Sequence, residues 1–283
     1  MRIVNIHDEI IDYGVKLINP IKQWDISKGN NINIAVLDTG IDYNHEDLKD
    51  NIKGGINFTT ADANDYIDRA GHGTFCAGII AAEENGQGII GVAPNANLYA
   101  VKVLNDQGQG ILTWLIRGID WCLTHDIDII SMSIGFERDS EQMHAVIKEA
   151  YKRDIIMIAA VGNNNKETEA EYPARYDEVI GVTAIDSTEH IASFDTTGEK
   201  VEISAPGVDI TSTYPGNLYA IGSGTSFAVP HISGAIALIQ AGAVAKTGKK
   251  LSCEEVRKFI DNNAIDLGTP GRDIDFGFGL FRF

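Results

Sequence analysis

Basic residues are scarce in this sequence. Among 283 residues, 23 Lys and Arg stand against 40 Asp and Glu, which gives a formal net charge of -17. Proteins bind the phosphate backbone of nucleic acids through Lys and Arg, and a surface with such an excess of acid repels it. We therefore expect no nucleic-acid partner.

Cysteine is also rare. The three cysteines, Cys76, Cys122 and Cys253, are odd in number, far apart and without C-x-x-C spacing. This pattern argues against a disulfide framework and against a structural zinc site. We expect three buried thiols.

Long apolar runs are missing as well. None approaches the 18 or so residues that a bilayer-spanning helix needs, so we expect no transmembrane helix and no membrane partner. At the start of the chain, Asp8 and Glu9 interrupt the sequence before a secretory-type apolar core can form. The sequence therefore predicts a cytoplasmic protein.

Apolar, β-branched runs are abundant by comparison. Hydrophobic residues make up 44% of the chain and charged residues 22%, a globular composition. Stretches with helical periodicity separate five apolar runs, at residues 32–37, 98–104, 127–134, 155–161 and 179–185. This alternation predicts an α/β fold of three layers, in which a mostly parallel central sheet carries helices on both faces.

The sequence predicts one domain preceded by a short N-terminal arm. Its length alone allows about two domains. However, the loops rich in Gly, Asn and Asp include no linker-like stretch. We predict an N-terminal arm over residues 1–23 and one domain over residues 24–283.

Polar residues whose side chains could take part in a reaction follow several of the predicted strands. In an open parallel sheet, ligands bind beyond the carboxyl ends of the strands. Asp38 and Asn163 occupy such ends. Ser226 follows two glycines and precedes an apolar helix, whose N-terminus provides a positive field. His72 is the one histidine flanked by two glycines.

Asp38, His72 and Ser226 together predict nucleophilic catalysis, although each alone is a weak signal. A serine hydroxyl needs a base within hydrogen-bonding reach and a third group that fixes the tautomer of the base. His231 is the competing base. It lies five residues from Ser226 on the same predicted helix, about 140° around the axis, and does not easily reach the hydroxyl.

Two other functions are excluded because their sequence motifs are incomplete here. Asp38-Thr39-Gly40 also spells the aspartic protease motif, but that mechanism needs a second such carboxylate, and Asp195-Thr196-Thr197 has the wrong third residue. Dinucleotide binding requires G-x-G-x-x-G, and here the third glycine, Gly78, comes two positions late.

The chain resembles the subtilisin family of serine endopeptidases from about Ile21 to its end. The triad residues have the chain order Asp, His, Ser that subtilisin has. The short segment before the first predicted strand and the acidic composition resemble the intracellular branch of the bacterial subtilisins more than the secreted branch. The blocks that carry the resemblance are residues 35–40, 71–74, 131–135, 162–163, 224–231 and 277–280.

This resemblance implies a role for each matched residue. Ser226 would be the nucleophile, His72 the general base and Asp38 the carboxylate that orients it. Asn163 would stabilise the oxyanion together with the Ser226 N–H. The substrates would be proteins or peptides, and the chain a monomer or homodimer. The alternative is a non-catalytic, peptide-binding or regulatory relative, for which the presence of all four residues leaves little room.

The resemblance also implies a groove in which the substrate adds as a strand. The two edges of the groove would be Ser133, Ile134 and Gly135 on one side and Gln107, Gly108 and Gln109 on the other. The wall of the first specificity pocket would be formed by Ala160, Val161 and Gly162. A second, apolar pocket would be lined by Ile111 and Leu115.

Glu171 departs from the family pattern, because many relatives carry glycine at this position on the pocket floor. A carboxylate that points into the pocket would give a cationic side chain a charge-assisted partner. We therefore expect some tolerance or preference for Lys or Arg before the cut bond.

A structural calcium ion is the one cofactor that the resemblance implies. Calcium accepts carboxylate and carbonyl oxygens with flexible geometry. The predicted ligands are the side chains of Asp47 and Asn85 and the carbonyl oxygens of Glu83, Gln87 and Ile89; the N-terminal side-chain ligand is not identifiable. A second, weaker cation site is expected near Ala174, Tyr176 and Val179.

Overall fold

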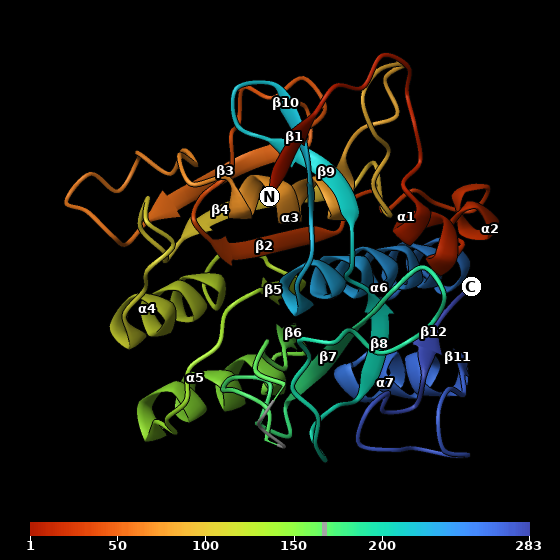
Figure 1. The fold of residues 1–283 in the computed structure, drawn as a ribbon. Coiled ribbons are helices and arrows are strands. Elements are labelled where there is room, and N and C mark those ends of the chain that lie inside the picture. The colour runs from red at the N-terminus through yellow and green to blue at the C-terminus, as the bar shows by residue number, and fades with distance from the viewer. Residues whose placement is uncertain (166–168) are drawn as a thin grey trace.

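A mostly parallel sheet crosses the centre of the molecule. The computed structural model describes residues 1–165 and 169–283 (Figure 1). Within them the central sheet has nine strands, in the order β11-β12-β8-β7-β6-β5-β2-β4-β3, and only the edge strand β11 is antiparallel to its neighbour. The strands are β2 (Asn33–Asp38), β3 (Ile52–Asn57), β4 (Asn97–Lys102), β5 (Ile129–Met132), β6 (Ile156–Ala160), β7 (Val179–Ile185), β8 (Ile203–Pro206), β11 (Ala264–Ile265) and β12 (Leu280–Phe281).

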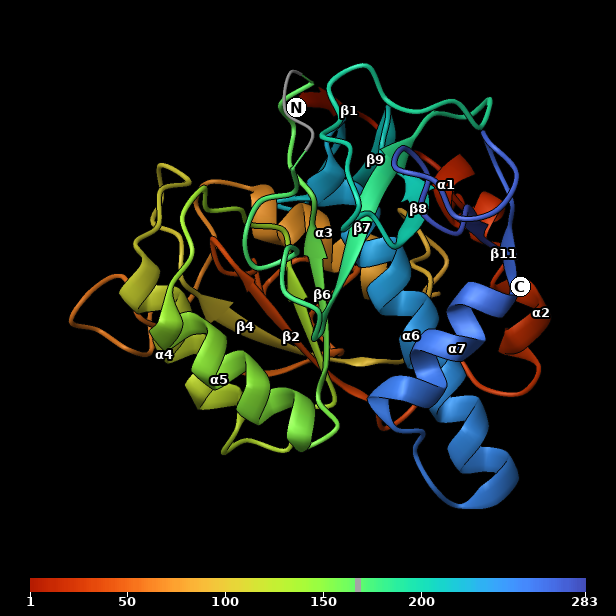
Figure 2. The ribbon, with the colours of Figure 1, turned by 90° about the horizontal axis from the view of Figure 1, so that it is seen from below.

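Helices cover both faces of this sheet, which confirms the predicted three-layer α/β fold. Helices α3 and α6 lie on one face, with α7 against α6, and α4 and α5 lie on the other (Figure 2). Their bounds are α3 (His72–Ala81), α4 (Leu112–Cys122), α5 (Glu141–Lys152), α6 (Thr225–Thr247) and α7 (Cys253–Asn262).

Each face of the sheet has its own hydrophobic core. Alternate residues of a strand point to opposite faces. In β2, Ile34 and Val36 belong to the core beneath α3 and α6, whereas Ala35 and Leu37 belong to the core beneath α4 and α5. All six residues of β2 are therefore buried, as expected for a strand covered on both sides.

A second, antiparallel sheet joins the start of the chain to the segment before Ser226. It has the order β1-β10-β9, with β1 (Arg2–Val4), β9 (Ile210–Tyr214) and β10 (Leu218–Gly222). The predicted arm also includes α1 (Tyr13–Ile18) and the start of α2 (Ile21–Trp24). Val15 and Ile18 are 2% and 0% exposed in the core under α6. Residues 1–23 thus contribute to the core, and a boundary at residue 23 stays a prediction.

Helix α6 bears on the expectation that no helix crosses a membrane. An 18-residue window of this 23-residue helix has a mean hydropathy of 1.5, so by length and composition it could cross a membrane. The sequence pattern hides this because Ser, His and Gln interrupt the apolar residues. The helix packs against β5, β6, β7 and β8, and 89% of the window is buried inside the protein. A helix that is apolar all round is what a central core position requires.

Candidate active site

Asp38 and His72 meet where β2 ends and α3 begins. The two carboxylate oxygens of Asp38 lie 2.8 and 2.9 Å from Nδ1 of His72. Asp38 is 0% exposed, and the His72 side chain is 26% exposed. A buried carboxylate therefore holds one ring nitrogen while the ring remains accessible from solvent.

Glycines on both sides of His72 allow this close approach. A Cβ atom on Gly73 would lie 2.1 Å from the Gly40 carbonyl oxygen and 3.0 Å from Cβ of Asp38. Gly71 has φ = +101°, a conformation that favours glycine. Only a chain without side chains at these two positions brings the start of α3 onto the end of β2 in this way.

Asp68 organises the turn that leads to His72, a role that sequence reasoning missed. Its Oδ1 accepts hydrogen bonds from the N–H groups of Ala70 and Gly71 and from Thr39 Oγ1. Its Oδ2 accepts from the N–H and the hydroxyl of Thr74. Asp68 is 2% exposed. Its only sequence signal is a position near the start of a helix, which many acidic residues share.

The surroundings of His72 favour its charged form. Burial alone lowers the pKa of His72, but the negative charge of Asp38 and the hydrogen bond to it outweigh that effect, so the pKa is raised above its ordinary value. The site therefore stabilises an imidazolium once the ring has taken up a proton. Because a general base must start neutral, its activity would appear as pH rises through this raised pKa.

Ser226 lies in the first turn of α6, beside His72. Its carbonyl oxygen accepts a hydrogen bond of 2.7 Å from Ser133 Oγ and one of 3.5 Å from Cys76 Sγ. The ring of the next residue, Phe227, lies 5.6 Å from the His72 ring between centroids. The hydrogen bonds that place Ser226 run through its backbone. The bond from its hydroxyl to His72, which a triad requires, stays a prediction.

Cys76 shows how closely this region is packed. Its sulfur lies within 4.8 Å of a carboxylate oxygen of Asp38 and a ring nitrogen of His72. Burial raises the pKa of its thiol well above the ordinary value. All three cysteines are buried free thiols, as predicted.

Asn163 is anchored through the oxygen of its side-chain amide. Its Oδ1 accepts hydrogen bonds from the Thr225 N–H at 2.9 Å and from the Thr225 hydroxyl at 3.1 Å. Two donors on one oxygen fix the amide orientation and leave the Nδ2 group as its donor. Thr225 is the first residue of α6, so the amide lies next to the N–H of Ser226.

His231 is held away from the site, in agreement with the sequence argument. It is 0% exposed, and its Nδ1 lies 2.8 Å from the Phe227 carbonyl oxygen. Burial lowers the pKa of His231 to about 4. A Cβ atom on Gly14 would lie 2.6 Å from its Nε2, so the ring packs against α1.

A pocket of about 300 Å³ opens beside His72. It brings together four of the predicted substrate residues, Ser133, Ile134, Gly135 and Gly108, on two sides of one hollow. Its lining is completed by Thr39, His72, Leu104, Gly110 and Phe136. The two predicted edges therefore face the same space, next to the predicted base.

The edge at residues 107–109 differs from the expectation in its hydrogen bonding. The Asn105 side chain accepts from the N–H groups of Gln107 and Gln109, and the Asn105 carbonyl accepts from Gly108 N–H. Because these N–H groups close a tight turn, they are already paired within the chain, and the role of this edge in binding a peptide strand stays a prediction.

The two residues of the predicted apolar pocket differ in exposure, although the Leu115 N–H donates to the Ile111 carbonyl at 3.4 Å, and the pocket stays a prediction. Leu115 is 1% exposed in the core beneath α4, whereas Ile111, just before that helix, is 51% exposed. Leu104 and Gly110, which sequence reasoning did not single out, line the hollow beside His72.

Glu171 lies between Gly135 and Gly162, at the predicted first specificity pocket. A Cβ atom on Gly135 would lie 1.5 Å from Glu171 Oε2, and one on Gly162 would lie 3.1 Å from Glu171 Cδ. The Glu171 N–H donates to the Val161 carbonyl at 2.9 Å, which places the residue beside the predicted wall at Ala160, Val161 and Gly162. The carboxylate thus occupies the space between Gly135 and Gly162.

The predicted calcium residues lie together around a loop that follows α3. Asp47 is 0% exposed; its Oδ2 accepts from Ile89 N–H and Tyr219 Oη, and its Oδ1 from Asn85 Nδ2. Within the described chain, no hydrogen bond from a protein donor is found on the carbonyl oxygens of Glu83, Gln87 and Ile89. A Cβ atom on Gly88 would lie 2.1 Å from Asp47 Oδ2, so glycine there keeps the cradle open. This oxygen-rich set fits calcium.

Glu9 joins this loop from the N-terminal segment. Its Oε1 accepts hydrogen bonds of 2.8 Å from Asn85 N–H and 2.6 Å from Gly86 N–H. Sequence analysis did not identify the N-terminal side-chain ligand of this predicted site. The structure places the Glu9 carboxylate against the backbone N–H groups of this loop.

Comparison with known proteins agrees with this geometry. The model of the subtilase family, peptidase S8, matches residues 29–279. The chain is 46% identical over 258 residues to the minor extracellular protease Epr of Bacillus subtilis, covering 90% of this chain but only 38% of that protein. It is 43% identical to an intracellular serine protease of Paenibacillus polymyxa, covering 92% and 82% of the two chains. To subtilisin DY of Bacillus licheniformis it is 40% identical, covering 97% of both. The chain therefore belongs to the subtilase family and is a subtilisin-like serine endopeptidase.

Proposed function

We propose that this endopeptidase hydrolyses peptide bonds with Ser226 as nucleophile, His72 as general base and Asp38 as the group that orients His72. The Ser226 oxygen attacks the carbonyl carbon of the substrate as its proton passes to Nε2 of His72. Asp38, bonded to Nδ1, stabilises the imidazolium that results. His72 then protonates the leaving amine, and an acyl-enzyme remains.

Asn163 and the start of α6 would carry the negative charge of the tetrahedral intermediate. The Nδ2 group of Asn163 and the Ser226 N–H are the two donors, and both are fixed before the substrate arrives. Water then attacks the acyl-enzyme, with His72 taking up and returning a proton a second time. The same donors serve both halves of the reaction.

One observation carries this proposal: the buried Asp38 carboxylate holds the accessible imidazole of His72 next to the N-terminus of α6. A relative that only binds peptides has no need of a buried charge beneath a histidine, since burying a carboxylate costs free energy unless it is paired. The pair therefore favours catalysis over the non-catalytic alternative.

Covalent labelling tests this function directly. A fluorophosphonate probe reacts only with an activated serine, and we expect one adduct, on the peptide that contains Ser226. Mass spectrometry of the labelled, digested protein locates it. Labelling should disappear in the Ser226→Ala and His72→Ala variants. An adduct at another serine, or none in the unaltered protein, would show that Ser226 is not the nucleophile.

We also propose that the first specificity pocket prefers Lys or Arg before the cut bond. The Glu171 carboxylate lies between Gly135 and Gly162, where a substrate side chain would enter. An ionised partner in a partly dry pocket forms hydrogen bonds about twice as strong as neutral ones. The protein or peptide substrates would therefore be cut after basic residues.

Calcium is proposed as a structural cofactor at the loop of residues 83–89. Asp47, Asn85 and the carbonyl oxygens of Glu83, Gln87 and Ile89 would hold the ion, with Glu9 as a further carboxylate. When bound, calcium would join the N-terminal segment to this loop and to Asp47. Its contribution is to stability, because these residues lie outside the pocket beside His72.

Removal of calcium is expected to lower Tm by about 5–10 °C, the shift for an ion present at about a hundred times its Kd. Differential scanning fluorimetry of an inactive Ser226→Ala protein, with calcium or with EGTA, measures it without autolysis. Asp47→Asn should remove the calcium response, while Asp50→Asn, which alters a nearby exposed carboxylate, should keep it. Equal responses in the two variants would contradict the site.

We further propose a cytoplasmic location, which the likeness to the Paenibacillus intracellular protease supports. Three buried free thiols are consistent with a reducing compartment. Another similar protease, Epr, is named extracellular, so fractionation of the native host decides between the two locations. The oligomeric state that we predict, a monomer or a homodimer, stays a prediction.

A further inference from the structure

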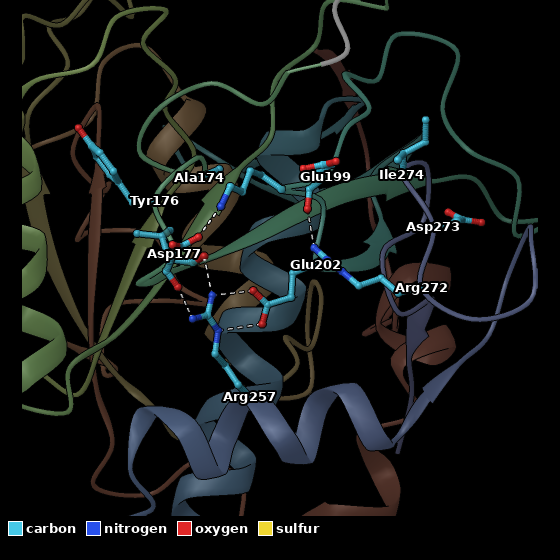
Figure 3. Close-up of a pocket in the computed structure, with 11 residues that line it drawn as sticks. Ala174, Tyr176, Asp177, Glu199, Glu202, Arg257, Arg272, Asp273 and Ile274 are labelled. Atoms are coloured by element: carbon cyan, nitrogen blue, oxygen red, sulfur yellow. Dashed lines mark hydrogen bonds and ion pairs between the residues drawn. The ribbon is translucent and has the colours of Figure 1, made fainter.

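A pocket of about 410 Å³ lies on the far side of β7 from α6, where the second, weaker cation site was expected (Figure 3). Ala174, Tyr176 and Val179, the three residues of that expectation, all line it. The rest of the lining includes acidic residues as well as three cationic side chains, Lys200, Arg257 and Arg272. The oxygen atoms of this pocket could be neutralised by a bound metal ion or by one of these cationic side chains.

Arg257, from α7, reaches across this pocket to the start of β7. Its Nε and Nη2 donate to the two carboxylate oxygens of Glu202 at 2.9 and 2.7 Å. Nη2 also donates to the Val179 carbonyl at 2.9 Å, and Nη1 donates to the Asp177 carbonyl (Figure 3). The Arg257 and Glu202 side chains are 21% and 13% exposed. One guanidinium therefore binds a carboxylate and two carbonyl oxygens at once.

Other oxygens near the same place are also occupied by donors. The Tyr176 carbonyl accepts from the Val179 N–H at 3.1 Å. Lys200 pairs with the Asp177 carboxylate, and Arg272 donates to the carbonyl oxygens of Glu199 and Val201. A metal ion here would face a fixed guanidinium and would have to displace hydrogen bonds from most of its oxygen ligands. The residues present do not fit a second metal site.

We propose that the Arg257 guanidinium is the permanent cation of this pocket and takes the place of a bound metal ion. Its planar fork of donors matches a carboxylate and adjacent carbonyl oxygens. Because it is covalently attached to α7, neither dilution nor a chelator removes it. It ties α7 to the start of β7 and to the residue preceding β8. This inference does not depend on the catalytic proposal.

The test asks whether removing the guanidinium creates a cation dependence that the unaltered protein lacks. Arg257→Met and the control Arg153→Met are made in the full-length, inactive Ser226→Ala chain. Arg153 is matched because it also binds a carboxylate, Glu149, and a carbonyl, but at 48% exposure. Tm is measured at a fixed, saturating calcium concentration. Potassium or sodium chloride replaces choline chloride at constant ionic strength, so that general screening does not change.

We expect the unaltered chain and the Arg153→Met control to show no dependence on potassium or sodium. Arg257→Met should lose about 10 °C in choline chloride, since Glu202 is left without its partner. It should regain a large part of this as potassium or sodium saturates the vacated oxygens. If Arg257→Met does not fold, Arg257→Gln carries the same comparison.

Two results would overturn the proposal. In one, the unaltered chain itself gains stability saturably with potassium or sodium, which means that a metal ion binds here beside Arg257. In the other, the Arg257 variant is insensitive to both ions, which means that the oxygens do not form a cation site even when the guanidinium is gone.

Discussion

Replacement of Ser226 by alanine is expected to lower kcat by about 10⁶-fold, the loss measured for the equivalent change in subtilisin itself and taken over here from that relative. The variant keeps the Asp38–His72 pair, the Asn163 amide and the fold, because the bonds that place residue 226 run through its backbone. KM should therefore change little. Steady-state cleavage of a chromogenic peptide measures both constants.

Ser223→Ala is the matched control for this variant. Ser223 lies three residues earlier, is exposed, and its hydroxyl accepts a hydrogen bond from Asp209 N–H. Its loss should leave kcat within a few-fold of the unaltered enzyme. A Ser226→Ala protein that retained more than a thousandth of the activity would contradict the assignment of the nucleophile.

Replacement of Glu171 by glutamine is expected to lower the preference for arginine over phenylalanine before the cut bond by about 10–100-fold. A hydrogen bond to a charged group contributes about 1.5–3 kcal/mol, and each 1.4 kcal/mol is a factor of ten. Glutamine keeps the size of the side chain and removes only its charge. The measurement is the ratio of kcat/KM for two peptides that differ in that one residue.

Glu169→Gln is the control for this change. Glu169 is two residues away, its side chain is 66% exposed, and it pairs with Arg175. Its removal should not alter the ratio. A strong preference for phenylalanine in the unaltered enzyme, or an equal ratio in the Glu171→Gln variant, would rule out a role for Glu171 in selecting basic residues.

The layers follow from sequence because strands depend on local patterns of apolar residues, whereas the Asp38–His72 pair was expected from the conjunction of Asp38, His72 and Ser226 and from the family resemblance. Each apolar run of the predicted sheet became a buried strand, since strands covered on both faces need continuous apolar residues. Asp38 had to lie at the carboxyl edge of that sheet. Gly73 explains why His72 could be predicted to lie close: no other residue fits against Gly40.

The remaining parts depend on contacts between distant segments, which sequence periodicity does not encode. Glu9 reaches the predicted calcium loop only because the N-terminal segment folds back to Gly88 and Ile89. Arg257 fills the expected second cation site from a helix near the end of the chain. The turn at Asn105 likewise pairs the N–H groups of the predicted groove edge at residues 107–109 within the chain.

The pairing of β1 with β10 has a consequence for how the protein is made. Val4 lies opposite Tyr219, so β1 is synthesised about 215 residues before the strand that it pairs with. At the usual rate of about 5–20 residues per second, that delay is on the order of 10 to 40 s. During this time β1 is an unsatisfied strand edge, and its three-residue length limits the risk that a neighbouring nascent chain pairs with it.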